Sequence, residues 1–160
     1  FIDSDDLWAR NKLELQVKFM NKKKLRFSHT SYYLINEQGN KISSRIAKKN
    51  LFYSDLIKSC DIGLSTVILK KDLFSNPNYR FANLKTKEDY VLWLKLAKDG
   101  ILLNGLDENL VSWRKNKNSL SSSVTQKIID GFRVYNSYLK FNIFKSIICL
   151  LILSINSVTR

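Results

Sequence analysis

The sequence predicts an α/β fold, in which helices and strands alternate along a chain of 160 residues. Helical periodicity runs through 7–21 and 87–98, whereas aromatic and β-branched residues dominate 25–36 and 64–69. A hydrophobic share of 44% is enough to bury a sizeable core, and 5 Gly with 1 Pro exclude collagen-like and low-complexity chains. The length is that of about one domain.

The first segment begins with Phe1-Ile2-Asp3, which has the pattern of the end of a buried strand. Ser4, Asp5 and Asp6 follow as N-cap side chains for a helix from Leu7 to about Asn21. Residues at three- and four-residue spacings define the buried face of this helix: Leu13, Val17 and Met20.

Strand patterns dominate the middle of the chain. The segment 25–36 is predicted to be a strand, and the turn signal at 37–40 predicts a hairpin with 41–43. Further elements are expected in order: a short helix at 53–60 capped by Ser54, a buried strand at 64–69, and a loop at 75–78.

The second half begins with a strongly apolar helix predicted over 87–98 and ended by Gly100. Short strands are expected at 101–103 and 110–114, followed by a polar loop at 116–123. From Val124 onward the pattern is helical and becomes more apolar, and its apolar run at 141–155 is shorter than the roughly 20 residues that span a bilayer. We therefore expect an interfacial helix, the alternative being a core helix.

Composition restricts the possible chemistry. Cys60 and Cys149 lack the short spacings of a zinc knuckle or a disulfide framework, which favours a reducing compartment. His29 is the single histidine, so a site that needs two imidazoles is excluded. The 27 Lys plus Arg exceed the 14 Asp plus Glu by 13, and they are spread along the chain. This excess suits anionic lipid, phosphorylated substrates or, as a weaker rival, nucleic acid.

Three polar segments could carry chemistry. Asp3-Ser4-Asp5-Asp6 suits Mg²⁺ or Mn²⁺, whose ligands are hard oxygens, but acids in a first helical turn also act as caps. Glu88-Asp89 could supply a general base, or could simply complement the dipole of the helix that it begins. The basic, hydroxyl-rich loop 113–121 could bind a diphosphate or be an ordinary solvated loop.

Taken together, these segments resemble the second half of a family 2 glycosyltransferase. The resemblance runs in order from Phe-Ile-Asp-Ser-Asp-Asp-Leu-Trp at 1–8, through the turn at 37–40 and Ile-Gly-Leu-Ser-Thr-Val at 62–67. It is sharpest at Glu-Asp-Tyr-Val-Leu-Trp-Leu (88–94), and it ends at Trp113-Arg114 with Asn-Ser-Leu-Ser at 118–121.

The resemblance implies a GT-A fold, with a mixed sheet and flanking helices, and transfer of a sugar from a UDP-, GDP- or dTDP-sugar to an acceptor hydroxyl. It assigns Asp3 and Asp5 to a divalent cation, Mn²⁺ or Mg²⁺, with Asp6 as a helper. It makes Asp89 the base of an inverting displacement, supported by Glu88. Donor binding would involve Asp3, Arg114 and Ser119, and Asn116 stands where the family often has histidine.

The resemblance also implies a division of the chain. Residues 1–123 correspond to a partial GT-A domain whose nucleotide-binding half is expected to be missing, and 124–160 to a helical, membrane-associated segment. We expect a cytoplasmic protein, peripheral on the inner face of the cell membrane, that builds surface polysaccharide or glycolipid on a saccharide or lipid-linked acceptor and binds no nucleic acid. The alternative is a non-catalytic remnant or interaction module.

Overall fold

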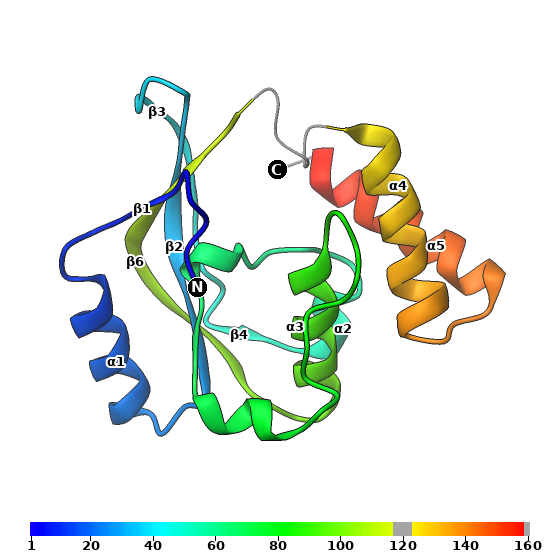
Figure 1. The fold of residues 1–160 in the computed structure, drawn as a ribbon, viewed down its shortest axis with the longest axis horizontal. Helices are drawn as coiled ribbons and strands as arrows, with labels where there is room; N and C mark the ends of the chain where they lie inside the picture. Colours follow the sequence, from blue (N-terminus) through cyan, green and yellow to red (C-terminus); the bar gives the residue numbers. More distant parts are fainter. Residues whose placement is uncertain (117–122, 159–160) are drawn as a thin grey trace.

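A computed structural model describes residues 1–116 and 123–158, which fold around a six-stranded mixed sheet (Figure 1). The main strand order is β1-β6-β2-β3, while β4 pairs with β6 and β5 pairs with β2. The pairing of β2 with β6 is parallel, and the other pairs are antiparallel. The strands are β1 (Leu7–Trp8), β2 (Phe27–Ile35), β3 (Lys41–Arg45), β4 (Asn50–Leu51), β5 (Ile68–Leu69) and β6 (Leu103–Arg114).

Helices cover both faces of this sheet. α1 (Lys12–Lys22) lies on one face, and α2 (Tyr53–Leu56) and α3 (Glu88–Lys98) lie on the other (Figure 1). Two 3₁₀ turns, η1 (Leu64–Thr66) and η2 (Lys71–Ser75), connect β5 to its neighbours. The C-terminal helices pack beside α3: α4 (Val124–Arg133), the π-helical turn η4 (Val134–Tyr138) and α5 (Ile143–Val158).

The core is centred on α3, which is buried on nearly all sides. Its consecutive residues 90–94 are fully buried, because the sheet covers one side and the C-terminal helices cover another. Phe27 of β2 packs against Trp93 with ring centroids 5.1 Å apart. On the opposite side, the hydroxyl oxygens of Tyr90 and Tyr135 lie 3.3 Å apart. The apolar character of 90–97 therefore reflects burial between two layers.

Several predicted elements are confirmed. The strand expected at 25–36 is β2, its hairpin partner is β3, and the helix at 87–98 is α3. The turn between the two strands depends on Gly39, whose φ of +88° is unfavourable for other residues. A helical pattern after Val124 is also present, as α4, η4 and α5.

The prediction for the first helix is wrong in two respects. Residues 7–8 form a strand that pairs with β6, so the helix begins at Lys12. Its buried face consists of Lys12, Gln16 and Met20, whereas Leu13 and Val17 are about half exposed. The physical reason is a buried hydrogen-bond network, in which Lys12 Nζ donates to Gln16 Oε1 and Gln16 Nε2 donates to Ser28 and Thr66.

Other boundaries also differ from the prediction. The buried strand expected at 64–69 is mostly η1, because the Thr66 hydroxyl and amide both bond to Gly63 O, and strand pairing begins at Ile68. The two short strands at 101–103 and 110–114 are one continuous strand, β6. The helix at 53–60 ends at Leu56 and is preceded by Phe52 as its N-cap residue. Residues 1–3 are not in a strand.

Candidate functional site

The acidic segment Asp3–Asp6 forms a turn at the end of the sheet. The amide of Asp6 donates to Asp3 O at 3.2 Å, and the amide of Asp3 donates to Ser65 Oγ at 3.0 Å. Trp8 Nε1 donates to Ser65 O at 2.8 Å, so η1 holds the turn from both ends. Asp3 and Asp5 are partly exposed, whereas Asp6 is buried. Two carboxylates therefore face solvent, and the third is part of the scaffold.

The end of β6 fixes the other side of this turn. Arg114 N donates to Asp6 Oδ1 at 2.9 Å, and Arg114 Nε donates to Asp5 O at 3.0 Å. The Nη1 atom of Arg114 donates to the carbonyl oxygens of Asn36 and Glu37. The guanidinium of Arg114 thus clamps the acidic turn against the β2–β3 hairpin. The side chain of Asn116 donates directly to Asp5 Oδ2 at 2.5 Å.

The charges of Asp3, Asp5 and Asp6 show whether this segment suits a cation. Burial raises the pKa of Asp3 and the neighbouring charge of Asp5 raises it further. Burial also raises the pKa of Asp6, whose Oδ2 accepts no hydrogen bond from the described residues. A hard divalent cation would relieve this repulsion, so the chemistry of Asp3 and Asp5 fits one. Within the described ranges, no group of three or more His, Cys, Asp or Glu is arranged to hold a metal.

Glu88 and Asp89 form the first turn of α3. The preceding residue, Lys87, has a left-handed backbone with φ +66°, which sets the direction in which the helix starts. Asp89 Oδ1 accepts the Tyr90 amide at 2.7 Å, and both acids are partly exposed. The pair therefore begins the most deeply buried helix of the protein, and the carboxyl group of Asp89 is itself largely surrounded by protein atoms.

The surroundings of Asp89 shift its ionisation toward neutral pH. Its pKa is raised to about 7, mainly because burial penalises the carboxylate and also because Glu88 is negatively charged. Three neighbouring groups lower the pKa of Asp89 without cancelling this rise: the Tyr90 amide, the Trp93 indole and the charge of Lys87. A carboxylate with this pKa accepts a proton more readily near neutral pH than an ordinary aspartate does.

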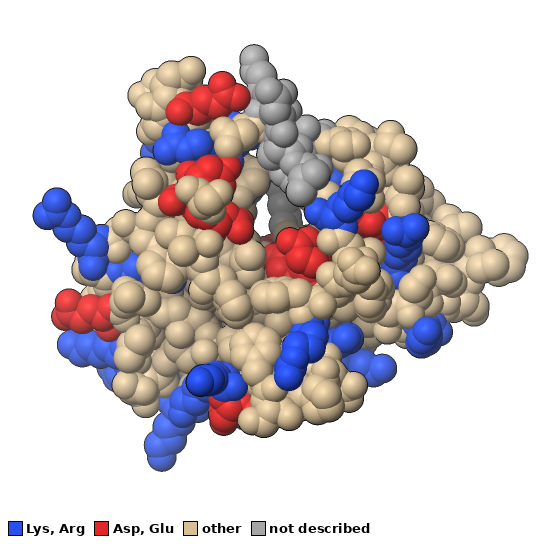
Figure 2. Space-filling view, in the orientation of Figure 1, with Lys and Arg blue, Asp and Glu red and all other residues tan. Residues whose placement is uncertain are grey.

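Aromatic packing connects the two acidic segments. Phe1, two residues before Asp3, has its ring centroid 6.4 Å from that of Trp93, one helical turn after Asp89. Phe81 completes the cluster, at 5.3 Å from Phe1 and 6.4 Å from Trp93. The chain segment that leads into the acidic turn is thereby packed against the first half of α3. Acidic side chains gather near the centre of the face shown in Figure 2.

One predicted site residue, Ser119, lies outside the described residues. The structure also adds residues that the sequence did not single out. Ser65 holds the acidic turn, and Asp130 of α4 accepts hydrogen bonds from Thr86 just before α3. An isolated Ser and an isolated Asp carry no local signal, so only the fold reveals these partners.

The sequence is related to bacterial glycosyltransferases over its whole length. A teichuronic acid biosynthesis glycosyltransferase of Bacillus subtilis, TuaG, is 31% identical over 161 residues, covering 100% of this chain and 63% of the relative. The Escherichia coli UDP-Glc:alpha-D-GlcNAc-diphosphoundecaprenol beta-1,3-glucosyltransferase WfaP is 31% identical over 163 residues, covering 100% and 62%. A second Escherichia coli protein with the same enzyme name, WfgD, is 38% identical over 99 residues, covering 62% of this chain and 38% of the relative. No family model matches the chain.

Solved structures show the same fold. The S. aureus TarS fragment 1–349, solved with UDP-GlcNAc, superposes with a TM-score of 0.64 at 17% identity, covering 94% of this chain and 45% of that one. Its complex with UDP superposes with a TM-score of 0.58. The chain spans about three-fifths of the length of TuaG and WfaP. The two acidic segments thus lie on a GT-A framework, in a chain that is similar over its whole length to bacterial glycosyltransferases.

Proposed function

We propose that this chain forms the catalytic part of an inverting glycosyltransferase, which moves a sugar from a UDP-, GDP- or dTDP-sugar to an acceptor hydroxyl. The observation that carries the proposal is Asp89, whose carboxyl group has its pKa raised to about 7 by burial at the start of α3. It begins the helix against which the segment bearing Asp3 and Asp5 is packed. One carboxylate group is thus available to accept a proton, and a second group to bind a cation.

Asp89 acts on the acceptor. A hydroxyl is a weak nucleophile at neutral pH, so a base must take its proton while the new glycosidic bond forms and the bond to the leaving diphosphate breaks. Adjacent helical residues point about 100° apart, so Glu88 and Asp89 cannot both point the same way. Asp89 accepts the proton, and Glu88 raises the proton affinity of Asp89 through its charge.

Asp3 and Asp5 act on the donor. A divalent cation held by their carboxylates would neutralise charge on the departing diphosphate, and phosphate and water oxygens would complete its shell. Asn116 orients the carboxylate of Asp5 through its hydrogen bond to Oδ2. The guanidinium of Arg114 bonds to three carbonyl oxygens, so its contribution is to position the acidic turn.

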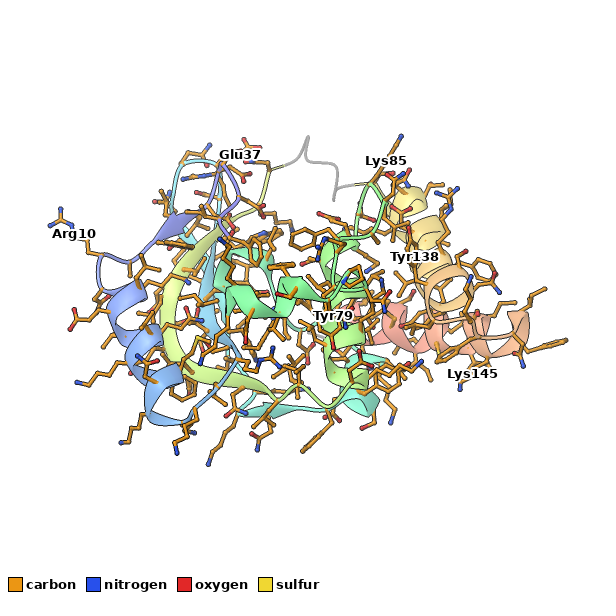
Figure 3. All side chains as sticks on the ribbon, turned by 60° about the horizontal axis from the view of Figure 1, so that its bottom comes forward. Arg10, Glu37, Tyr79, Lys85, Tyr138 and Lys145 are labelled. Atoms are coloured by element: carbon orange, nitrogen blue, oxygen red, sulfur yellow. The ribbon has the colours of Figure 1, made fainter. Side chains whose placement is uncertain are left out.

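The acceptor is proposed to be lipid-linked. WfgD and WfaP are named for a sugar-diphosphoundecaprenol acceptor, and the C-terminal helices of this chain expose a matching apolar surface. On α5, Ser146, Cys149 and Leu153 pack inward, whereas Phe144, at 82% exposed, begins an outward face with these further members: Ile147, Ile148, Leu151 and Ile155. Figure 3 shows Lys145 of the same helix at the outer side of the molecule.

This outward face of α5 supports peripheral binding to an anionic membrane, on the cytoplasmic side, with 124–160 as the contacting unit. Apolar side chains would enter the boundary between headgroups and acyl chains, and lysines would meet the headgroups. In the parts of the chain that the structure describes, no helix is both long and apolar enough to cross a bilayer.

Transfer is tested by supplying UDP-glucose, Mn²⁺ and a short-chain prenyl diphosphate-linked GlcNAc to the wild type and to Asp89→Asn. We expect the Asn variant to lose about 10²–10⁴-fold in turnover while it keeps its affinity for UDP. Glu88→Gln is the matched control and should cost less. Normal turnover by the Asn variant would overturn the role of Asp89. A wild type that neither binds UDP nor transfers sugar would favour the non-catalytic interaction module instead.

Membrane binding is tested by co-sedimentation with phosphatidylglycerol vesicles. Replacing Phe144, Ile148 and Leu151 by Gln should release the protein from the vesicles, because it removes apolar side chains from the membrane-facing surface. The variant should stay folded, because these side chains are 56–82% exposed and so contribute little to the core. Replacing Ile46 and Phe52, which are also well exposed but lie near β3 and α2, is the control and should leave sedimentation unchanged. Equal sedimentation by both variants would contradict a specific role of α5.

A further inference from the structure

A buried lysine occupies the first position of α1, where β1 leads into that helix (Figure 1). Lys12 is 0% exposed, and its Nζ atom donates to Gln16 Oε1 at 2.7 Å. The same atom lies over the ring of Trp8, 4.2 Å from the ring centroid. Among the described residues, no carboxylate forms a salt bridge with Lys12. The ammonium group is therefore held by a neutral amide and an aromatic face.

The charge of Lys12 lowers the stability of the fold. Burying an ammonium group without a carboxylate partner is unfavourable, because the group loses its hydration and gains no opposite charge. Burial accordingly lowers the pKa of Lys12 to about 8. An apolar side chain of similar length would fill the same space without this penalty. Packing alone does not account for a charged group at this position, whereas the contacts of its two partners do.

Gln16 connects Lys12 to η1. Its Nε2 atom donates to Thr66 O at 3.0 Å and to Ser28 O at 3.1 Å. A side-chain amide can take two orientations that exchange its oxygen and its NH₂ group, and an ammonium group can only donate. Lys12 therefore selects the orientation in which the amide oxygen faces Nζ and the NH₂ group faces the carbonyl oxygens of η1 and β2.

Trp8 makes a second connection to the same turn. Its ring faces the ammonium group of Lys12, and its Nε1 atom donates to Ser65 O at 2.8 Å. Attraction between a cation and the face of an indole ring favours this position of the ring. Ser65 in turn accepts the amide of Asp3 on its Oγ atom, at 3.0 Å. Both partners of Lys12 thus bond to adjacent residues of η1, and η1 holds the backbone of the acidic turn.

We propose that Lys12 is a positioning residue for the cation site at Asp3 and Asp5, an inference that rests on the proposed function. Its charge orients Gln16 and Trp8, these two side chains hold η1, and η1 holds the backbone of Asp3. The carboxylate of Asp3 is thereby kept in place beside that of Asp5. Lys12 is buried and acts through these contacts, so it binds neither the cation nor the donor itself.

The test compares Lys12→Met with the wild type at pH 7, by calorimetric titration of Mn²⁺ with and without UDP and by unfolding in urea. The coupling is the factor by which UDP tightens Mn²⁺ binding. It should be at least about tenfold in the wild type and less than about threefold in the variant, because Asp3 is no longer held in place. The urea midpoint should stay the same or rise, because the substitution removes an unpaired buried charge. A purely structural role would lower both quantities together.

Two further variants provide the control and test the connection to η1. Lys18→Met removes the charge of an exposed lysine on the same helix and should change neither quantity. Trp8→Phe keeps a ring beside the ammonium group but removes the hydrogen bond to Ser65. Its coupling should therefore lie between those of the wild type and of Lys12→Met, and wild-type coupling in Trp8→Phe would overturn the connection through Trp8.

The inference is overturned if Lys12→Met keeps the wild-type coupling, if it loses coupling together with a lower urea midpoint, or if Lys18→Met loses as much coupling. Sugar transfer by a Lys12→Met variant with intact coupling would leave the proposed function standing and reject only the role of Lys12. Loss of coupling in Lys12→Met without sugar transfer by the wild type would retain that role and reject the proposed reaction. A wild type without coupling would reject both.

Discussion

The carboxylate of Asp130 in α4 accepts both the amide and the hydroxyl of Thr86, 44 residues away, at 2.9 and 3.0 Å. Gln126 Nε2 donates to the same oxygen at 2.9 Å. Burial alone would raise the pKa of Asp130, but these hydrogen bonds and the charge of Arg133 outweigh it and leave the pKa below its ordinary value. The start of the helix that carries Asp89 is thus held by a buried, ionised carboxylate on a distant helix.

The first prediction concerns this tether. Asp130→Ala should lower the free energy of unfolding by about 1–3 kcal/mol at neutral pH, since it leaves the Thr86 amide without its acceptor. Because the folded-state pKa is depressed, the stabilisation is present above the ordinary Asp pKa and disappears as the pH falls through the lower, folded value. Urea unfolding between pH 7 and pH 3 measures both effects. An equal difference between variant and wild type across this range would contradict ionisation of Asp130.

The second prediction concerns the cation at Asp3 and Asp5. Binding of Mn²⁺ should be weak alone and at least tenfold tighter with UDP, because two carboxylates leave most of an octahedral shell to phosphate and water oxygens. Asp5→Ala should abolish this coupling. Asn116→Ala should weaken it less, since it removes a hydrogen bond to Asp5 and no carboxylate.

The measurement for the metal is calorimetric titration of Mn²⁺ with and without UDP. Asp72→Ala is the control, because Asp72 is an exposed acid on η2 that pairs with Arg26. Equal Mn²⁺ binding by wild type and Asp5→Ala would exclude this carboxylate as a ligand.

The third prediction concerns the pH dependence of transfer. Only ionised Asp89 accepts a proton, and its pKa is raised to about 7, so kcat/KM should rise with pH and level off above about pH 7. A raised carboxyl pKa also means that the folded state disfavours the charge, so Asp89→Asn should be more stable than wild type at pH 8. A rate profile that is flat from pH 5 to 8 would contradict this assignment.

The fourth prediction concerns His29 in β2, which is 1% exposed. Burial lowers the pKa of His29 to about 4, from an ordinary value of 6.5. Between these two pH values His29 is protonated in the unfolded chain and neutral in the folded one. Stability should therefore fall with decreasing pH in this window, by up to about 1.4 kcal/mol per pH unit from this residue. His29→Gln should show a smaller slope in urea titrations. A slope identical to wild type would show that His29 does not titrate in this way.

Sequence alone was sufficient for elements whose patterns are local. The helix α3 could be predicted because its apolar residues, its acidic first turn and Gly100 after its end lie within about a dozen positions. The strand β2 and its hairpin likewise follow from alternating aromatic and hydroxyl residues with a turn signal after them. The order of the acidic segments also indicated a resemblance to glycosyltransferases, and the relatives that match the whole chain are named as glycosyltransferases.

What the tertiary structure decided are the partners of polar side chains, because a hydrogen bond depends on position in space and not on distance along the chain. Periodicity places Leu13 and Val17 inside, yet Lys12 and Gln16 are the buried residues. Gln16 accepts from Lys12 and donates to Ser28 and Thr66, so both polar side chains find partners in the interior. Arg114 looks like a ligand for phosphate in the sequence, but it binds carbonyl oxygens of the acidic turn and the hairpin. The amino-acid order determines which residues can carry charge and helical structure, and packing determines which charges remain available to a ligand.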